Sequence, residues 1–211
     1  MGTYQNSEFY DDPKQWMRRK ESMGKEILYR PPWPKRHWWV VRFRHMLERI
    51  PAESPVLDLG CGNGLLAAFL WHEGRKNPYL GIDFSEGSVE EARRCNKKAG
   101  HQNAEFRCGS IFELDIAHEL RELGPRAMVT CAETLEHLED DLELLSHIPA
   151  RTHVLITVPM FDEEAHVRWF PHQLDVEERY GKLFSSPKVE RISAKFRRKG
   201  QQCFSISGRF K

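Results

Sequence analysis

The feature that most constrains this chain is a glycine-rich turn at residues 60–64, which follows an apolar strand and precedes a helix. Residues 55–60 (PVLDLG) have the nearly unbroken apolar character of a strand buried on both faces, and helical spacing of apolar residues begins at Leu65. Glycines in such a turn let backbone amides approach a ligand closely, because no Cβ blocks the approach. The unit predicts an α/β fold with a cofactor site at the end of the strand.

The rest of the chain alternates short apolar strands with helices, as parallel βαβ units do. Further strands are expected at residues 79–85, 104–110, 127–133 and 153–159, and helices at 65–73, 88–100 and 140–147. Ser85 is a suitable N-cap for the second helix, and Gly100 is suited to end it. Residues 188–196 and 203–211 flank a turn around Gly200 and predict an antiparallel hairpin. We therefore expect a three-layer α/β domain with a seven-stranded, mostly parallel sheet.

The first 50 residues differ in character from the rest. They contain four of the six tryptophans, namely Trp16, Trp33, Trp38 and Trp39. The prolines of RPPWPKR (residues 30–36) interrupt any helix there, whereas residues 37–50 have helical spacing, with an apolar face formed by Trp39, Phe43, Met46, Leu47 and Ile50. We expect residues 1–50 to form a helical cap or substrate lid and residues 51–211 to form the cofactor-binding domain.

The tryptophans of this cap have two interpretations. Trp33, Trp38 and Trp39 either stack on a substrate ring or pack in the core. In the first case the basic side chains between them would meet phosphate or carboxylate groups, the candidates being Arg30, Lys35 and Arg36.

The near-neutral charge of the chain hides a segregation. The formal net charge is +1 over 211 residues, but it is +5 in residues 1–50, −9 in residues 51–150 and +5 in residues 151–211. An anionic small-molecule substrate is therefore compatible with the basic ends. The sequence holds no zinc finger, RNA-binding motif or long basic stripe, which disfavours a nucleic-acid partner.

The cysteines and the hydropathy of the chain bear on its compartment. The five cysteines are scattered and lack any CxxC spacing, which argues against a disulfide framework and a structural zinc site. No stretch approaches the roughly 20 consecutive apolar residues needed to span a bilayer. These patterns predict a cytoplasmic protein without a membrane partner, and they leave the oligomeric state open.

The spacing of the glycines separates two classes of cofactor. A dinucleotide-binding loop needs GxGxxG, and the position of its third glycine is occupied here by Leu65. The loop also has no lysine, which excludes a P-loop, and it carries Asp58 in the preceding strand. An acidic loop suits a cationic cofactor better than a phosphate.

The stretch VLDLGCGNG (residues 56–64) resembles motif I of the class I S-adenosylmethionine-dependent methyltransferases, which have a Rossmann-like fold. The resemblance implies that the loop holds the methionine and ribose portion of the cofactor, and that Asp83 accepts hydrogen bonds from both ribose hydroxyls. The segment CGSIFELD (residues 108–115) resembles the stretch that lies along adenine, with Ser110 where the family usually has Asp. The implied cofactor-binding residues are Asp58, Gly60, Cys61, Gly62, Gly64, Asp83, Phe84, Ser110, Ile111 and Glu133. S-adenosylhomocysteine would be the product.

A cluster of carboxylates and histidines follows the fourth strand. If a helical turn begins near Glu133, then Glu133, Glu136 and His137 lie at i, i+3 and i+4 on one face. The loop at residues 158–170 follows the fifth strand at the same edge of the sheet, so His166 is expected nearby. His172 is an alternative to it.

This ExxEH pattern resembles metal-dependent O-methyltransferases, both those that modify the 3′-terminal ribose of small RNAs and those of ubiquinone synthesis. The resemblance implies a metal site formed by Glu133, Glu136, His137 and His166, with Mg²⁺ or Mn²⁺ as the ion. The same segment is also similar to methyltransferases that bind no metal. There His137 would act as a base or order the substrate loop, and we therefore name His137 and His166 as the candidate catalytic residues.

We expect a methyltransferase that acts on a hydroxyl or amine of a small molecule or sugar-like metabolite, with or without help from a metal. One alternative is a 2′-O-methyltransferase of RNA 3′ ends. Another, of a different class, is a catalytically inactive partner subunit that binds S-adenosylmethionine. Intact Asp58, Gly60, Gly62 and Asp83 favour the enzyme over the inactive subunit.

Overall fold

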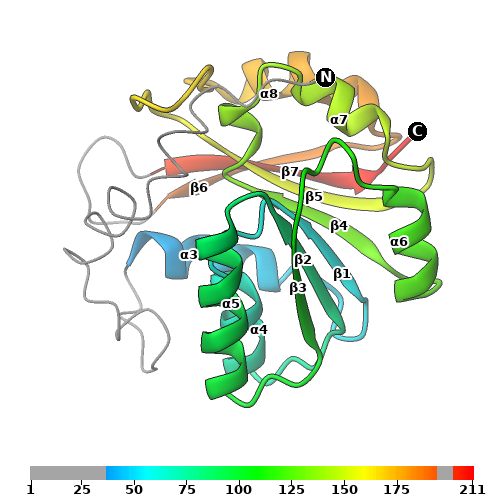
Figure 1. The fold of residues 1–211 in the computed structure, drawn as a ribbon. Coiled ribbons are helices and arrows are strands. Elements are labelled where there is room, and N and C mark those ends of the chain that lie inside the picture. The colour runs from blue at the N-terminus through cyan, green and yellow to red at the C-terminus, as the bar shows by residue number, and fades with distance from the viewer. Residues whose placement is uncertain (1–36, 194–201) are drawn as a thin grey trace.

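The computed structural model describes residues 37–193 and 202–211, and Figure 1 shows a central sheet with helices on both faces. The seven strands are β1 Val56–Leu59, β2 Tyr79–Asp83, β3 Ala104–Cys108, β4 Met128–Ala132, β5 His153–Pro159, β6 Lys188–Ser193 and β7 Gln202–Arg209. The helices are α3 Trp38–Leu47, α4 Leu65–His72, α5 Glu86–Lys98, α6 Ile116–Leu123, α7 Asp141–Ser146 and α8 Gln173–Tyr180, with 3₁₀ turns η1 Leu135–His137 and η2 Gly181–Leu183. The predicted seven-stranded α/β fold is confirmed.

The strands lie in the order β3-β2-β1-β4-β5-β7-β6. The first five are parallel, and β7 is antiparallel to both β5 and β6. The predicted C-terminal hairpin is therefore confirmed in its two strands, while its turn around Gly200 lies outside the described residues. The strand order reverses between β1 and β4, and ligands of such sheets bind beyond the carboxyl ends of the strands at that point.

Two apolar cores separate the three layers. One lies between the sheet and α6, α7 and α8, with Leu120, Leu144 and Tyr180 among its members. The other lies between the sheet and α3, α4 and α5, with Phe69 and Val89 among its members. Figure 1 shows the two groups of helices on opposite faces of the sheet.

Helix α3 packs its aromatic side chains on α4, as the apolar spacing predicts. The Trp39 ring lies edge-on to Phe69 at 6.4 Å between centroids, and Phe43 lies 5.8 Å from Phe69. Because Trp39 fills the core in this way, its interpretation as a substrate-stacking residue is wrong. The rest of the predicted cap, residues 1–36 with Trp33, Arg30, Lys35 and Arg36, lies outside the described residues.

Capping groups define several helix ends. The Ser85 hydroxyl accepts a hydrogen bond from Ser88 N, which confirms Ser85 as the N-cap of α5. Helices α6 and α8 were not expected from the sequence. Asp115 caps α6 by accepting from His118 N, and Asp175 accepts from His172 N in a capping box at α8.

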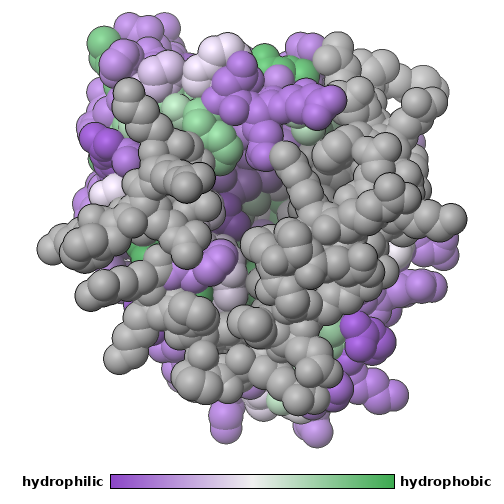
Figure 2. Space-filling model, turned by 90° about the vertical axis from the view of Figure 1, so that its left-hand side faces the viewer, coloured by the Kyte–Doolittle hydropathy of each residue, from purple (hydrophilic) through white to green (hydrophobic). Residues whose placement is uncertain are grey.

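The described surface is mostly polar. On the face that Figure 2 shows, hydrophilic residues make up most of the described surface and apolar residues appear only in small separate areas. Three large apolar side chains are exposed among the described residues, namely Leu142, Trp169 and Leu174. None of the described helices combines the length and apolar character needed to cross a membrane.

Candidate active site

The glycine loop is anchored to the sheet by its own backbone. Gly60 N and Cys61 N both donate to Ile82 O of β2, at 2.9 and 3.0 Å, and Gly64 N donates back to Cys61 O at 3.0 Å. All three glycines have positive φ angles, which are +77° at Gly60, +52° at Gly62 and +70° at Gly64. A side chain is strained in this conformation, so the backbone shape itself requires glycine.

The space around two of these glycines differs. A Cβ on Gly64 would lie 2.8 Å from Asn96 Nδ2 and 2.8 Å from Phe106, inside the packed layer. A Cβ on Gly62 would meet nothing within 4 Å. Gly64 therefore serves packing against α5, whereas the backbone at Gly62 is open to a ligand.

Asp83 at the end of β2 is joined to the glycine loop. Its Oδ2 accepts from Gly62 N at 2.8 Å, and its Oδ1 accepts from Ser85 N at 2.9 Å. A carboxylate has about four acceptor sites, two on each oxygen. The structure thus brings together two of the predicted cofactor residues, which are 21 positions apart in the chain.

Asp58 lies beneath the loop and is fully enclosed. Thr130 Oγ1 of β4 donates to Asp58 Oδ1 at 2.6 Å, and the Tyr79 hydroxyl of β2 donates to Asp58 Oδ2. Burial raises the pKa of Asp58 to about 6, against the lowering effect of these hydrogen bonds. In this structure the hydrogen bonds of Asp58 hold β1 to its two neighbours, and its role toward the cofactor stays a prediction.

The other predicted cofactor residues surround the same edge of the sheet. Ser110 Oγ accepts from Phe112 N at 3.3 Å, while Ile111 is buried in the core. The Phe84 carbonyl accepts from Cys108 Sγ at 3.4 Å. Cys61 is buried against Gly81, and burial raises the pKa of its thiol. Their contacts with a cofactor stay predictions.

The segment after β4 is not the expected helix. Glu133 has a positive φ of +54°, and only Leu135–His137 form a single 3₁₀ turn. No helical turn begins near Glu133, so the expectation that Glu133, Glu136 and His137 project from one face of a helix is wrong. Backbone hydrogen bonds set this path instead, because Glu133 N donates to Thr157 O at 3.0 Å.

Glu136, His137 and His166 nevertheless come together. One ligand atom of each lies within 4.8 Å of the other two, and the two imidazole rings meet edge-on at 5.0 Å between centroids. Glu133 is not part of this group among the described residues. Its Oε2 lies 3.3 Å from Arg42 Nη1 of α3 instead. His172, the alternative to His166, is the N-cap of α8 and does not belong to the group either.

Both histidines face a backbone carbonyl with one ring nitrogen. His137 Nδ1 lies 2.8 Å from Ala165 O, and His166 Nδ1 lies 3.2 Å from Phe161 O. A carbonyl only accepts, so each Nδ1 carries a proton, and in a neutral ring the lone pair is then on Nε2. These carbonyls come from the loop after β5, which thereby orients both rings.

Burial governs the protonation of this cluster. It lowers the pKa of His137 to about 4, so the imidazole is neutral at neutral pH. Burial also raises the pKa of Glu136 well above its usual range, and the neighbouring Glu133 raises it further. Glu136 Oε2 is buried without a hydrogen-bond partner among the described residues.

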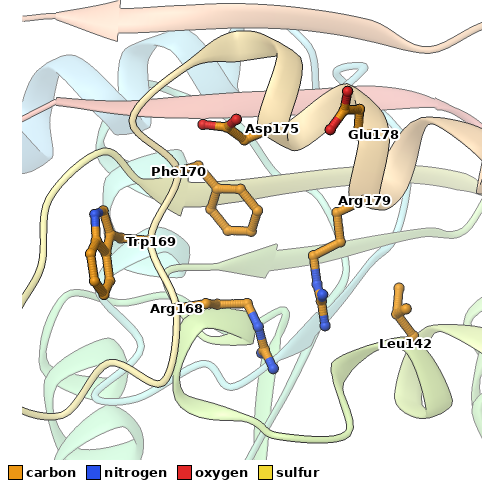
Figure 3. Close-up of a pocket in the computed structure, with 7 residues that line it drawn as sticks. All are labelled: Leu142, Arg168, Trp169, Phe170, Asp175, Glu178 and Arg179. Atoms are coloured by element: carbon orange, nitrogen blue, oxygen red, sulfur yellow. The ribbon is translucent and has the colours of Figure 1, made fainter.

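The loop after β5 also forms a surface pocket next to the cluster. Figure 3 shows its lining residues, which are Leu142, Arg168, Trp169, Phe170, Asp175, Glu178 and Arg179. Arg168 turns inward and donates to Leu135 O at 2.7 Å, so it stabilises η1. Trp169 is 44% exposed and does not pack in the core. Trp169 is therefore accessible to solvent, whereas Arg168 is held by a backbone carbonyl.

Two residues of this region carried no signal in the sequence. Arg42 contacts the Glu133 carboxylate, which is far from it in the sequence. Nothing in the position of Arg42 within α3 distinguishes it from a basic residue on the helix surface. Asp141 is fully buried and accepts from Arg179 Nη2 at 2.6 Å and from the Tyr180 hydroxyl at 2.6 Å, which ties α7 to α8. The pairing of Asp141 with Arg179 and Tyr180 could have been predicted only if α8 had been predicted.

Comparison with known proteins agrees with this geometry. The family described as methyltransferase domain matches residues 56–151. The chain is 35% identical over 94 residues to the ubiquinone biosynthesis O-methyltransferase of Acinetobacter baumannii strain AYE. The aligned segment covers 44% of this chain and 37% of the relative. It is 34% identical over 88 residues to mRNA cap guanine-N(7) methyltransferase 1 of Arabidopsis thaliana, which covers 37% of this chain and 24% of the relative.

The chain thus spans well under half the length of these curated relatives. Among solved structures, magnesium protoporphyrin IX methyltransferase from Synechocystis PCC 6803 with bound SAM matches with a TM-score of 0.64 at 16% identity. That match covers 97% of this chain and 94% of the other. Residues 56–151 therefore match a methyltransferase domain, and the chain shares its fold with solved S-adenosylmethionine-dependent methyltransferases.

Proposed function

We propose that this protein transfers a methyl group from S-adenosylmethionine to a hydroxyl of a small molecule. The observation that carries the proposal is the contact between Gly62 N and Asp83 Oδ2 at 2.8 Å, which sets an open glycine backbone beside the carboxylate at the end of β2. That pair suits the vicinal diol of a ribose. The match of residues 56–151 to the methyltransferase domain supports the same cofactor.

The residues divide the work around the cofactor. Bound S-adenosylmethionine supplies an electrophilic methyl group on a sulfonium. Asp83 would accept from the ribose hydroxyls, and the loop at residues 60–64 would hold the methionine end, while Ser110 and Ile111 would border adenine. The remaining task of the protein is to align the acceptor, exclude water and take up its proton.

His137 is the residue that we assign to the proton. Its Nε2 keeps a lone pair because Nδ1 donates to Ala165 O, and its low pKa keeps the ring neutral at neutral pH. His166 stands next to it with the same tautomer. The two rings therefore present basic nitrogens to the space at the carboxyl ends of β4 and β5.

The same atoms fit a divalent ion. Two imidazole nitrogens held by carbonyls, together with the unpartnered Glu136 Oε2, form a ligand set whose outer hydrogen bonds are already in place. Two nitrogen donors favour Mn²⁺ over Mg²⁺, which prefers oxygen. A bound ion would lower the pKa of a coordinated hydroxyl, and this favours oxygen over nitrogen as the methyl acceptor.

A second candidate function is methylation of the terminal ribose hydroxyl of an RNA. The exposed Trp169 in the loop after β5 favours it, because an exposed aromatic face can stack on a base. The curated relatives act on different atoms by name, one being an O-methyltransferase and the other a guanine-N(7) methyltransferase. They therefore leave the acceptor to experiment.

Calorimetry with S-adenosylmethionine and S-adenosylhomocysteine tests the proposal directly. We expect wild type to bind both, and Asp83→Asn to bind at least about tenfold more weakly, since two charge-assisted hydrogen bonds are weakened. Asp175→Asn is the matched control, because Asp175 also accepts a backbone N–H but caps α8, outside the predicted cofactor residues. Binding of neither ligand by wild type would refute the proposal and support neither enzyme function.

Metal analysis tests the ion separately. Wild type incubated with Mn²⁺ and desalted should retain it, and Glu136→Gln should not, while Glu143→Gln on the exposed face of α7 should behave as wild type. Equal metal content in all three proteins, with activity unaffected by a chelator, would leave His137 as a base and exclude the ion.

A further inference from the structure

Asn96 supports the glycine loop from behind. It lies in α5 and is 1% exposed, and its Nδ2 donates to Gly64 O at 3.2 Å and to Ala92 O at 3.0 Å. Gly64 is the last glycine of the loop and the N-cap of α4. The amide therefore joins the end of the cofactor loop to the neighbouring helix.

The orientation of this amide is fixed by His101. Asn96 Oδ1 lies 3.0 Å from His101 Nδ1, and since the amide oxygen accepts, His101 Nδ1 must donate. Burial lowers the pKa of His101 to about 4, so the ring is neutral and Nε2 carries no proton. This agrees with His101 Nε2 being buried without a hydrogen-bond partner among the described residues, because an unpaired acceptor costs less than an unpaired donor.

His101 is itself held in place. Its ring stacks on Trp71 at 4.9 Å between centroids and 17° between planes, and Trp71 Nε1 donates to Ala99 O at 3.0 Å. His101 N donates to Asn96 O at 2.9 Å. The chain of contacts thus runs from Trp71 in α4 through His101 and Asn96 to Gly64.

Helix α5 connects this series of contacts to Asp83, the other predicted cofactor residue that contacts the glycine loop. The helix begins one residue after its N-cap Ser85, and Asp83 stands directly before that turn. Asn96 on the same helix holds Gly64, while Asp83 accepts from Gly62 N. Two positions of the glycine loop, Gly62 and Gly64, are therefore held by residues in or just before α5.

We propose that Asn96 and His101 are positioning residues that set the affinity for the cofactor by fixing the glycine loop against Asp83. The proposal rests on the proposed function, since it takes the loop to be the S-adenosylmethionine site. The pair touches no cofactor atom in this assignment and acts through the Gly64 carbonyl. It should therefore govern KM for S-adenosylmethionine and leave kcat nearly unchanged.

The chain offers a matched control at the opposite edge of the sheet. Asn77 is also a buried amide, 2% exposed, and its Nδ2 also bridges two carbonyls, Pro51 O at 2.8 Å and Ser54 O at 2.6 Å. It precedes β2, whereas the cofactor loop follows β1. Asn77→Ala and Asn96→Ala thus remove the same kind of bonds, and they differ in their distance from the loop.

The test compares the two variants by calorimetry with S-adenosylhomocysteine and by thermal melting. Both variants should melt at lower temperature, and Asn96→Ala alone should weaken binding, by about tenfold. With an acceptor in hand, KM for S-adenosylmethionine should rise by the same factor at nearly constant kcat. Folded Asn96→Ala that binds as tightly as Asn77→Ala would overturn the proposal.

Two His101 variants keep the proposal falsifiable if Asn96→Ala does not fold. His101→Asn retains an N–H donor close to the position of Nδ1, and His101→Ala removes it. The proposal requires wild-type affinity in the first and weaker binding in the second, and it fails if both bind like wild type. Wild type that binds no S-adenosylhomocysteine would refute the proposed function instead, so the two failures are distinguishable.

Discussion

The Arg42 guanidinium lies 3.3 Å from the Glu133 carboxylate and joins α3 to the turn after β4. The two side chains are only 14% and 16% exposed, so each charge depends on the other for compensation. Arg42→Met keeps the aliphatic stem and leaves Glu133 uncompensated, which should lower the free energy of unfolding by about 2 kcal/mol.

Urea denaturation of Arg42→Met, Glu133→Gln and the double variant measures this coupling. Arg44→Met is the control on the same helix. Additive effects of the two single substitutions would contradict an interaction between the side chains.

Substitution of two loop glycines should separate stability from binding. Gly64→Ala places a Cβ within 2.8 Å of Asn96 and Phe106 at a φ of +70°, so strain and overpacking add to a loss of about 2 to 4 kcal/mol. Gly62→Ala meets no neighbouring atom and should lose only about 1 kcal/mol. Its methyl group would instead occupy the open side of the loop.

Thermal melting and binding of S-adenosylhomocysteine distinguish the two effects. We expect Gly62→Ala to melt close to wild type and to bind weakly. The explanation of the loop would be wrong if Gly62→Ala bound normally or if Gly64→Ala melted like wild type.

Much of the sheet could be predicted because its strands carry unbroken apolar runs that end in turn residues. The strand at residues 56–59 and the glycine-rich turn that ends it follow from the sequence for this reason. Helix α8 could not be predicted, because it buries only Val176 and Tyr180 and so lacks an apolar stripe. Its stability comes from a capping box and from Asp141 on another helix.

Three of the four predicted metal ligands, Glu136, His137 and His166, do come together, but the helical arrangement expected for Glu133 to His137 does not form. The spacing of Glu133, Glu136 and His137 resembles that of a helix, but the backbone of Glu133 turns left-handed because its N–H pairs with Thr157 O of β5. A hydrogen bond to a strand that follows later in the chain has no local signal. The pairing of Glu133 with Arg42 was missed for the same reason.

Asp58 should make stability depend on pH. Its pKa rises from 3.8 to about 6 on folding, so its stabilising contribution is fully present below pH 3.8 and is lost as the pH rises through about 6. The free energy of unfolding of wild type should therefore fall relative to Asp58→Asn between pH 4 and pH 7, by about 2 to 3 kcal/mol.

Urea denaturation across that range checks the sign. A difference that grows in favour of wild type with rising pH would contradict the assignment.

His137 should set the acid limb of activity. Because burial lowers its pKa to about 4, the profile of kcat against pH should decline near pH 4 rather than near pH 6.5. His137→Ala should lower kcat by about 100-fold with little change in the affinity for S-adenosylhomocysteine. His147→Ala, an exposed histidine at the end of α7, is the control. Full activity in His137→Ala would remove it from the catalytic residues.

The position of β7 has a consequence for how the protein is made. Strand β5 carries the loop that orients both candidate histidines, and its outer neighbour is β7, with His153 opposite Arg209 and Pro159 opposite Cys203. The ribosome synthesises that neighbour more than 40 residues after β5, so a nascent chain would present an unpaired strand edge throughout the interval. Pairing of β7 would thus both cover that edge and complete the support of the site, which couples the onset of activity to the synthesis of β7.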